Sequence, residues 1–238
     1  AVRYVRQSAG RRHVSVTTFA SFASMWLIPR LEAFQRDHPD IDIRVEASDS
    51  TVDLEVTDID VAVRYATAAR MPPAARRLFG ESVTPMASPW LLKSGPALKK
   101  PQDLLKHTLI EASDAYTPHL EWLTWRRWLD ANGLERAQPK RWLSFNYAYQ
   151  MVQAALSGQG VVLARPPLVA ESLARGELVE VFPHTRLHSP MAYWLLLAPR
   201  SAQRPEVKAF ADWLSAQAVA TREVTGEGED SDLVNDLD

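Results

Sequence analysis

The sequence of 238 residues contains no cysteine. This absence excludes disulfide bonds, thiolate metal sites and a cysteine nucleophile, and it fits a cytoplasmic protein. Long hydrophobic runs are also lacking, since no stretch approaches the roughly 18 uncharged apolar residues that a membrane helix needs. The segment Ala1 to Arg12 carries four arginines without a following apolar core, so we expect no secretory signal. We therefore predict a cytoplasmic protein with no membrane contact.

Known catalytic motifs are absent as well. There is no serine nucleophile elbow, no phosphate-binding loop and no His-Glu-x-x-His sequence. The Gly-x-Gly of residues 157–160 follows an expected helix, whereas a dinucleotide-binding turn follows a strand. His184 and His188 are four residues apart, but flanking prolines prevent a helix from aligning them on a metal ion. Asp58 and Asp60 are expected to be solvated carboxylates. We predict no catalytic residue, no cofactor and no metal ion.

The residues that are present indicate a folded globular protein. Hydrophobic residues make up 46% of the chain and there are eight tryptophans, enough for a sizeable core. The net charge is −2, but Arg222 to Asp238 carries seven acidic residues and one basic residue. The remainder is only weakly basic, which does not favour direct contact with nucleic acid. We predict that residues 220–238 form a disordered acidic tail.

The first third of the sequence has a strand–helix–strand pattern. His13 to Phe19 alternates in polarity and is rich in β-branched residues, which predicts a strand. Apolar residues at helical spacing predict a helix over Ala20 to Asp37, with a kink at Pro29 because proline interrupts helical hydrogen bonds. Two further strands are expected at Ile41 to Ala47 and Ile59 to Tyr65. This order is typical of an open, mostly parallel α/β sheet.

Alternating strands and helices continue to Gln217, too many for one small sheet. A helix is expected at Leu120 to Asn132, with Trp122, Trp125 and Trp128 on one face that packs in the core. The fold class that we predict is α/β with two lobes and a ligand cleft between them. The predicted division is residues 1–12 as the end of a solvated helix, 13–85 with 191–219 as the first lobe, and 86–190 as the second, with crossovers near Val83 to Ala87 and Ser189 to Tyr193.

The strongest local signal for a binding site lies at the junction of the first strand and the first helix. Thr17, Thr18, Phe19 and Ser21 lie where backbone N–H groups and the helix dipole converge. This arrangement binds carboxylates and other anions. An alternative is that Thr18 or Ser21 only caps the helix.

Other candidates follow the neighbouring strands. Ser48 follows the second strand, and Arg64 and Tyr65 end the third, so they should lie at the same edge of the sheet. Arg64 could hold an acidic ligand group by two hydrogen bonds, or it could form a structural salt bridge. Asn146 is at a second strand–helix corner, where it could contact a ligand or cap the helix.

Five segments form an ordered set that covers nearly everything between Arg11 and Gln217. They are RRHVSVTTFASFASMWLIPRLEAFQRDHPDIDIRVEAS (Arg11 to Ser48), DIDVAVRY (Asp58 to Tyr65), LFGESVTPMASPWLL (Leu78 to Leu92), QDLLKHTLI (Gln102 to Ile110) and MVQAALSGQGVVLARPPLV (Met151 to Val169). In this order the segments resemble the LysR-type transcriptional regulators. The resemblance is closest to the branch that includes the glycine-cleavage activator and the β-lactamase regulators.

This resemblance implies a domain similar to type II periplasmic binding proteins, with two lobes and an inter-lobe ligand cleft. It also implies that a DNA-binding winged helix-turn-helix and a linker helix precede this domain in the full-length protein, with residues 1–12 as the end of that linker. The family's pockets use the first strand–helix turn, the end of the third strand and the corners of the second lobe. The last of these adds Gly160 and Arg165 to the candidate effector-binding residues. The effector itself is not implied.

The resemblance further implies a homodimer, which becomes a tetramer in the full-length protein. In the family the first helix, here about Ser24 to Arg36, packs on a second-lobe helix of the partner, here about Tyr147 to Leu156. That packing requires exposed apolar residues on both helices. The candidates are Met25, Leu27, Met151, Val152 and Leu156.

The function that we predict is that of an effector-binding and dimerisation domain of a transcriptional regulator. A small, anionic molecule binds between the lobes, and an amino acid, an aromatic acid and a peptide-like ligand all remain open. The alternative is a stand-alone solute-binding protein of a transporter with the same fold, which would have to be exported.

Overall fold

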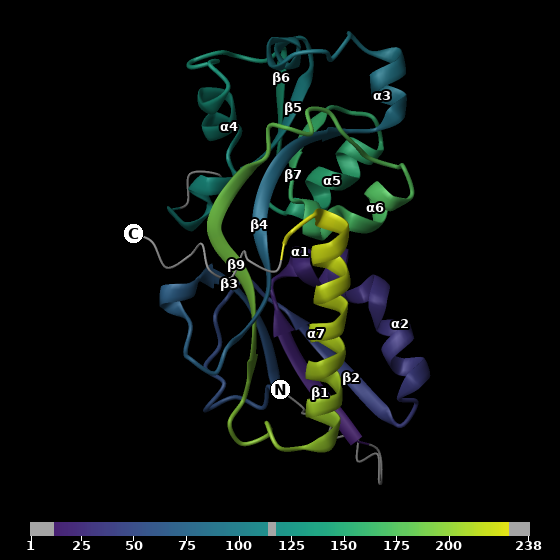
Figure 1. Cartoon of the computed structure of the whole chain (residues 1–238), viewed down its shortest axis with the longest axis vertical. Helices are drawn as coiled ribbons and strands as arrows, with labels where there is room; N and C mark the ends of the chain where they lie inside the picture. Colours follow the sequence, from purple (N-terminus) through teal and green to yellow (C-terminus); the bar gives the residue numbers. More distant parts are fainter. Residues whose placement is uncertain (1–11, 114–117, 229–238) are drawn as a thin grey trace, which may run out of the picture.

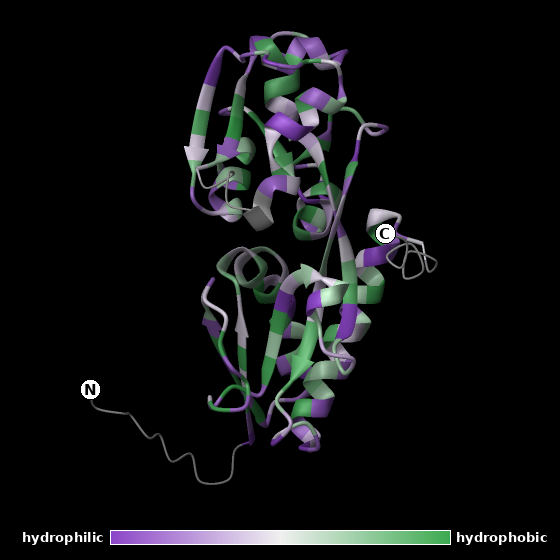
Figure 2. Cartoon of the chain, turned by 90° about the vertical axis from the view of Figure 1, so that its left-hand side faces the viewer, coloured by the Kyte–Doolittle hydropathy of each residue, from purple (hydrophilic) through white to green (hydrophobic). Residues whose placement is uncertain are grey.

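The computed structural model describes residues 12–113 and 118–228, and these form two lobes stacked along the long axis (Figure 1). Figure 2 shows the same two bodies from the side, joined by extended strands. We call the lower body lobe I and the upper body lobe II. No helix among the described residues is long and apolar enough to cross a membrane.

Lobe I contains the strand–helix–strand unit that the sequence predicts. Its elements are β1 (Arg12–Thr18), α1 (Ala20–Phe22), a π-helical turn (Ala23–Leu27), α2 (Ile28–Asp37), β2 (Ile41–Ala47), β3 (Val61–Thr67) and α7 (Pro205–Thr225). Strand β1 pairs in parallel with β2 on one side and β3 on the other. The carboxyl ends of all three strands therefore meet at the edge that faces lobe II.

Lobe II repeats this organisation with shorter elements. They are α3 (Pro89–Ser94), β5 (Thr108–Ala112), α4 (Trp125–Ala131), β6 (Arg141–Phe145), α5 (Ala148–Leu156), β7 (Val161–Ala164), α6 (Ala170–Ala174) and β8 (Val179–Glu180), with 3-10 helices at Pro101–Lys106, Pro118–Leu123 and Pro166–Val169. Strand β5 pairs in parallel with β6 and β7.

Two long strands, β4 (Arg76–Ala87) and β9 (Leu187–Leu197), run between the lobes and pair with each other antiparallel. They connect the lobe sheets in the order β2-β1-β3-β9-β4-β7-β5-β6, with β8 paired to β4. The expected α/β fold with two lobes is confirmed, and parallel pairing holds within each lobe. The antiparallel pairs all involve β4 or β9. The sheet is therefore mixed.

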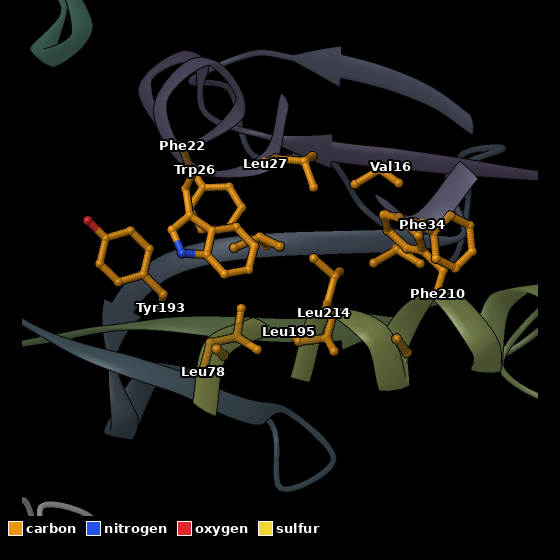
Figure 3. Packing of buried hydrophobic residues seen from close by; sticks show 14 of the residues in the cluster. Val16, Phe22, Trp26, Leu27, Phe34, Leu78, Tyr193, Leu195, Phe210 and Leu214 are labelled. Carbon is orange, nitrogen blue, oxygen red and sulfur yellow. The ribbon is translucent and has the colours of Figure 1, made fainter. Parts of the chain in front are cut away.

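Three clusters of buried side chains fill the two lobes, one in lobe I that also takes in Leu168 of lobe II, and two in lobe II. The lobe I cluster is aromatic at its centre, where the Phe22 and Trp26 rings stack with their centroids 4.9 Å apart and the edge of Phe34 meets Phe210 at 5.1 Å (Figure 3). Trp125 and Trp128 are buried in lobe II, as predicted for that face. Because Leu168 of lobe II packs into the lobe I cluster, the lobes are connected by side-chain packing as well as by the strands.

Two expected helices contain an interruption. In the first, residues 23–27 form a π-helical turn directly before α2, so the break expected near Pro29 occurs one turn earlier. Proline has no N–H to donate, and a π turn absorbs the missing bond without ending the helix. In the second, Thr124 accepts a hydrogen bond from the Arg127 N–H and starts α4, so Trp122 lies in the preceding 3-10 helix.

Asp60 does not have the solvated carboxylate that its sequence position predicts. Its side chain is buried, accepts a hydrogen bond from the Ser15 N–H at 2.9 Å, and pairs with Arg204 at 3.0 Å. Since Arg204 directly precedes α7, this buried pair fixes the start of α7 beside β1 and β3. The alternating sequence pattern predicted the strand. It did not identify Arg204, a distant residue whose positive charge offsets the cost of burying the Asp60 carboxylate.

The prediction of a disordered tail from residue 220 is wrong for its first part. Helix α7 continues to Thr225, Gly226 ends it in the left-handed conformation (φ 73°), and residues 229–238 lie outside the described residues. The Glu227 carboxylate accepts hydrogen bonds from the Gly80 N–H (2.9 and 3.0 Å) and from Arg77 (2.6 Å). The acidic composition alone suggested disorder, because composition does not reveal that Glu227 contacts β4.

The expected helix end at residues 1–12 also differs from the structure at Arg12, which begins β1. Residues 1–11 lie outside the described part.

The contact of Glu227 predicts a specific loss of stability. Replacing Glu227 by Gln removes a largely buried charge from Arg77, so we expect the free energy of unfolding to fall by about 1–3 kcal/mol, the range for charge-assisted hydrogen bonds. The measurement is urea denaturation followed by circular dichroism. The control is Glu223→Gln, an exposed acid on the same helix end. Equal stability of both variants would contradict the assignment.

Candidate functional site

A cavity of about 390 Å³ lies between the lobes and is lined by both of them. Lobe I contributes the turn after β1, the loop after β2 and the end of β3, and lobe II contributes the ends of β5 and β7 and the start of α5. The lining residues are Phe19, Ser21, Ser48, Asp49, Thr51, Val63, Arg64, Tyr65, Arg70, Ala112, Leu123, Asn146, Tyr147, Ala148, Met151, Leu163, Arg165 and Met191. The volume lies within the range of small-molecule pockets, roughly 300–1,000 Å³.

Most of the effector-binding candidates from the sequence meet in this cavity. They are Phe19, Ser21, Ser48, Arg64, Tyr65, Asn146 and Arg165. They meet because each lies at or just after the carboxyl-terminal part of a strand, and these ends face one another across the gap between the lobes. The sequence did not single out Arg70 or Met151 as cavity residues.

Three candidates do not line the cavity. Thr17 and Thr18 are both buried, and the Thr17 hydroxyl donates to the Glu46 carbonyl oxygen at 3.3 Å. The Thr18 hydroxyl has no hydrogen-bond partner among the described residues. Gly160 is buried at the start of β7, where a Cβ atom would lie 2.5 Å from the Thr108 carbonyl oxygen. Gly160 thus allows β7 to approach β5, which is a packing role.

The start of the first helix has a polar partner that the sequence analysis missed. Its first residue, Ala20, donates its N–H to the Asp49 carboxylate at 3.4 Å. Phe19 occupies the N-cap position, and its side chain forms no hydrogen bond with the helix. Neither Thr18 nor Ser21 caps the helix in the described structure. The site predicted for an external anion is therefore already contacted by a carboxylate of the chain itself.

Arg64 reaches over the loop that follows β2. Its guanidinium donates to the Val52 carbonyl oxygen at 2.6 Å, and burial lowers its pKa. None of the ion pairs within the described ranges includes Arg64, so the salt bridge considered as an alternative is not formed there. A half-buried cation without a nearby counter-charge is suited to an anionic ligand.

Arg165 belongs to a buried network that connects three parts of the fold. Its Nε donates to Glu81 Oε2 at 2.6 Å and its Nη2 donates to the Tyr193 hydroxyl at 2.7 Å. The Tyr193 hydroxyl in turn donates to Glu81 Oε2 at 2.5 Å. Burial raises the pKa of Glu81, and the charge of Arg165 and these hydrogen bonds offset part of that rise.

The sequence analysis did not select Glu81 or Tyr193, although one signal was available. Glu81 is a charged residue inside the long extended segment Leu78 to Ala87, whose other members are largely apolar or small. A charge in such a segment needs a partner if the segment is buried. Nothing local identifies that partner, because Arg165 is 84 residues further along the chain.

A second hollow, of about 750 Å³, lies between the first helix and helices α5 and α6. Met25, Val152 and Leu156 line it; Met25 and Leu156 are partly exposed, whereas Val152, like Met151, is buried at 8% exposure and so lacks the accessibility that the sequence predicted. The expectation that Leu27 is exposed is wrong, because its side chain is fully buried in the lobe I core. Met151 lines the inter-lobe cavity instead of this hollow. Helical periodicity groups these residues, but only the packed neighbours decide which face is covered.

Comparison with known proteins agrees with this architecture. The family pattern of the LysR substrate binding domain matches residues 7–219. The glycine cleavage system transcriptional activator of Escherichia coli K12 is 32% identical over 223 residues, which are 94% of this chain and 70% of that protein. The transcriptional activator AmpR of Pseudomonas aeruginosa is 31% identical over 86% of this chain and 66% of its own length.

Solved structures show the same fold. The effector domain of AmpR from Pseudomonas aeruginosa superimposes with a TM-score of 0.65 at 29% identity, over 90% of this chain and 98% of that one. CrgA, a LysR-type regulator from Neisseria meningitidis, gives a TM-score of 0.68 over 87% of this chain and 69% of its own, and at 19% identity it supports the fold alone. The chain therefore belongs to the LysR-type transcriptional regulators and contains their effector-binding domain.

Proposed function

We propose that this domain senses a small anionic molecule that binds in the inter-lobe cavity. The observation that supports this best is Arg64, a half-buried guanidinium that lines the cavity and has no ion-pair partner within the described part of the chain. Arg70 and Arg165 line the same cavity, and Asp49 is the one acidic residue among its lining residues. The lining therefore favours a negatively charged ligand.

The position of the cavity supports a switch mechanism. A ligand that contacts both lobes stabilises one angle between them, and a change of angle bends β4 and β9 and shifts the packing of α7 and the first helix against residues 166–174. Moving a two-state equilibrium from 1:99 to 99:1 needs roughly 5.5 kcal/mol of differential binding. Charge-assisted hydrogen bonds contribute about 1.5–3 kcal/mol each, so a few contacts across the cavity suffice.

In the full-length protein, the lobe movement would act on DNA through a preceding helix-turn-helix domain. The similar proteins are described as transcriptional activators, in one case HTH-type, which supports this arrangement and a cytoplasmic location. We infer a role in sensing and not in catalysis, because those proteins are regulators. The two lobes would comprise residues 13–85 with 191–219 and residues 86–190.

The hollow between the first helix and α5 supports a homodimer. Its apolar members include Met25 and Leu156, and Ile28, which follows Met25 by three residues along the helix, is 57% exposed. In a head-to-tail dimer, the first helix of one protomer would pack against α5 of its partner. Both helices then cover apolar side chains that the single chain leaves partly accessible. Tetramer formation would require segments outside this domain.

The cavity predicts a requirement for Arg64. A thermal-shift screen of amino acids, aromatic acids and cell-wall fragments identifies a ligand, since a hundredfold excess over Kd stabilises by about 2.7 kcal/mol. For that ligand, Arg64→Gln should weaken binding by about tenfold or more, as loss of one charge-assisted hydrogen bond does. The control is Arg36→Gln, an exposed arginine on α2. Unchanged affinity of the Arg64 variant in calorimetry would refute an anion site here.

The unpaired Thr18 hydroxyl predicts an unusual response to substitution. Thr18→Val removes a buried polar atom that has no partner in the described fold, so the free energy of unfolding should stay equal or rise by up to about 1 kcal/mol. Thr17→Val removes the bond to Glu46 and should lower it by about 1 kcal/mol. If Thr18→Val is the more destabilising of the two in urea denaturation, the hydroxyl has an internal partner. If Thr18→Val stays stable and also loses the ligand response, the hydroxyl serves the ligand.

The proposed dimer is tested by a charge in the hollow. Leu156→Glu places a carboxylate on the apolar face of α5, so the mass in sedimentation velocity should fall from that of two chains to that of one. The control is Val219→Glu, a partly exposed residue on α7 away from the hollow. A Leu156 variant that folds by circular dichroism and still sediments as a dimer would exclude this interface.

A further inference from the structure

Arg165 is held in a fixed position on the wall of the inter-lobe cavity by residues of the crossing strands. It follows β7 of lobe II, whereas its partners Glu81 and Tyr193 belong to β4 and β9. The Arg165 side chain is 10% exposed and the Glu81 side chain is fully buried. The guanidinium also lies over the Tyr65 ring at 4.8 Å from its centre, and Tyr65 lines the same cavity. The cation is thus buried beneath the cavity surface and cannot reorient without breaking these contacts.

The buried Glu81 carboxylate has fewer hydrogen-bond partners in the described part of the chain than its two oxygens could accept. Its Oε2 atom accepts both hydrogen bonds of the network, and its Oε1 atom has no partner among the described residues. The β4–β9 pairing changes register between Arg77 and Phe79 and again between Gly80 and Glu81, so Glu81 lies at one of the two irregular points of the crossing strands. The charge of Arg165 opposes the burial-raised pKa of this carboxylate, and hydrogen bonds from Arg165, Tyr193 and the Ser82 backbone act in the same direction.

We propose that Glu81 is a resident counter-ion of Arg165 with which an anionic effector competes, so that Glu81 sets the affinity of the cavity for anions. This inference rests on the proposed function and names the ligand class more narrowly, as a carboxylate small enough to reach the Arg165 guanidinium. The bonds to Glu81 and Tyr193 use two of the five guanidinium N–H groups, and a guanidinium that exchanges one of these partners can present two parallel N–H groups to a ligand carboxylate.

The competition also links the cavity to the crossing strands. When a ligand carboxylate draws Arg165 toward the cavity, Glu81 and Tyr193 lose the partner that connects β4 and β9 to lobe II. The change in partner takes place where the register of the two strands is already irregular. Binding of an anionic ligand in the cavity thereby changes the contacts of β4 and β9, the strands that run between the lobes.

The test compares carboxylate binding before and after the internal charge is removed. The probes are acetate, N-acetylglycine and N-acetylphenylalanine, each beside its neutral amide, titrated in NMR spectra of the folded domain. In Glu81→Gln the shape is kept and the counter-ion is lost, so carboxylate affinity should rise at least about tenfold, the lower end for close charge pairs. Affinity for the amides should not change. The control Glu180→Gln removes a carboxylate paired with Arg186, away from the cavity, and should bind like the wild type.

Equal or weaker carboxylate binding by Glu81→Gln overturns the inference, while binding by the wild type keeps the proposed function. If neither the wild type nor the variants bind any of the carboxylates, the proposed anion site itself fails, and the inference with it. A second measurement uses the unaltered protein, in case the variant does not fold. The Arg165 Nε–H resonance should move when N-acetylglycine saturates the domain, because its acceptor changes from Glu81 to the ligand. A resonance that stays in place at saturation contradicts the exchange of partners.

Discussion

The antiparallel pairing of β4 and β9 is the constraint on which the rest of this structure depends. These strands pair over most of their length, and each also joins a lobe sheet, β9 to β3 and β4 to β7. The first helix and α7 of lobe I also pack against residues 166–174 of lobe II, and Arg30 pairs with Glu171 at 3.6 Å, so relative motion of the lobes changes these contacts together with the pair of strands. A binding cavity that spans the gap can therefore act on the connection without unfolding either lobe.

Charge is distributed unevenly around that connection. On the cavity side, Arg165 is compensated by Glu81 from within the crossing strands, and Arg64 contacts only a backbone carbonyl among its described hydrogen-bond partners. On the other flank, Glu227 from the end of α7 accepts hydrogen bonds from Arg77 and the Gly80 N–H, one residue before Glu81. The crossing strand is thus held from two directions by buried or nearly buried charges, which are sensitive to any change of partner.

The helices of lobe I have a mixed role that explains several unexpected positions. Trp26 and Leu27 complete the core against α7 and the sheet, and the Trp26 indole donates to Thr221 near the end of α7. Met25, one position earlier, lies at the hollow beside α5 and α6. The π-helical turn that contains all three residues changes their angular spacing from that of a regular helix. A helical wheel drawn from the sequence therefore misplaces Leu27 on the accessible face.

The sequence by itself determined the order of strands and helices and the two-lobed α/β fold, and most of its candidate binding residues line the cavity. These follow from alternation, helical spacing and turn residues, which are properties of short segments, and from the rule that strand ends of parallel sheets converge. Only the tertiary structure decided that Asp60 meets Arg204, that Glu81 meets Arg165 and Tyr193, and that Glu227 returns to β4. The physical reason is that a buried charge is compensated by whichever residue packs against it, and in these cases that residue lies far along the chain, where no local pattern refers to it.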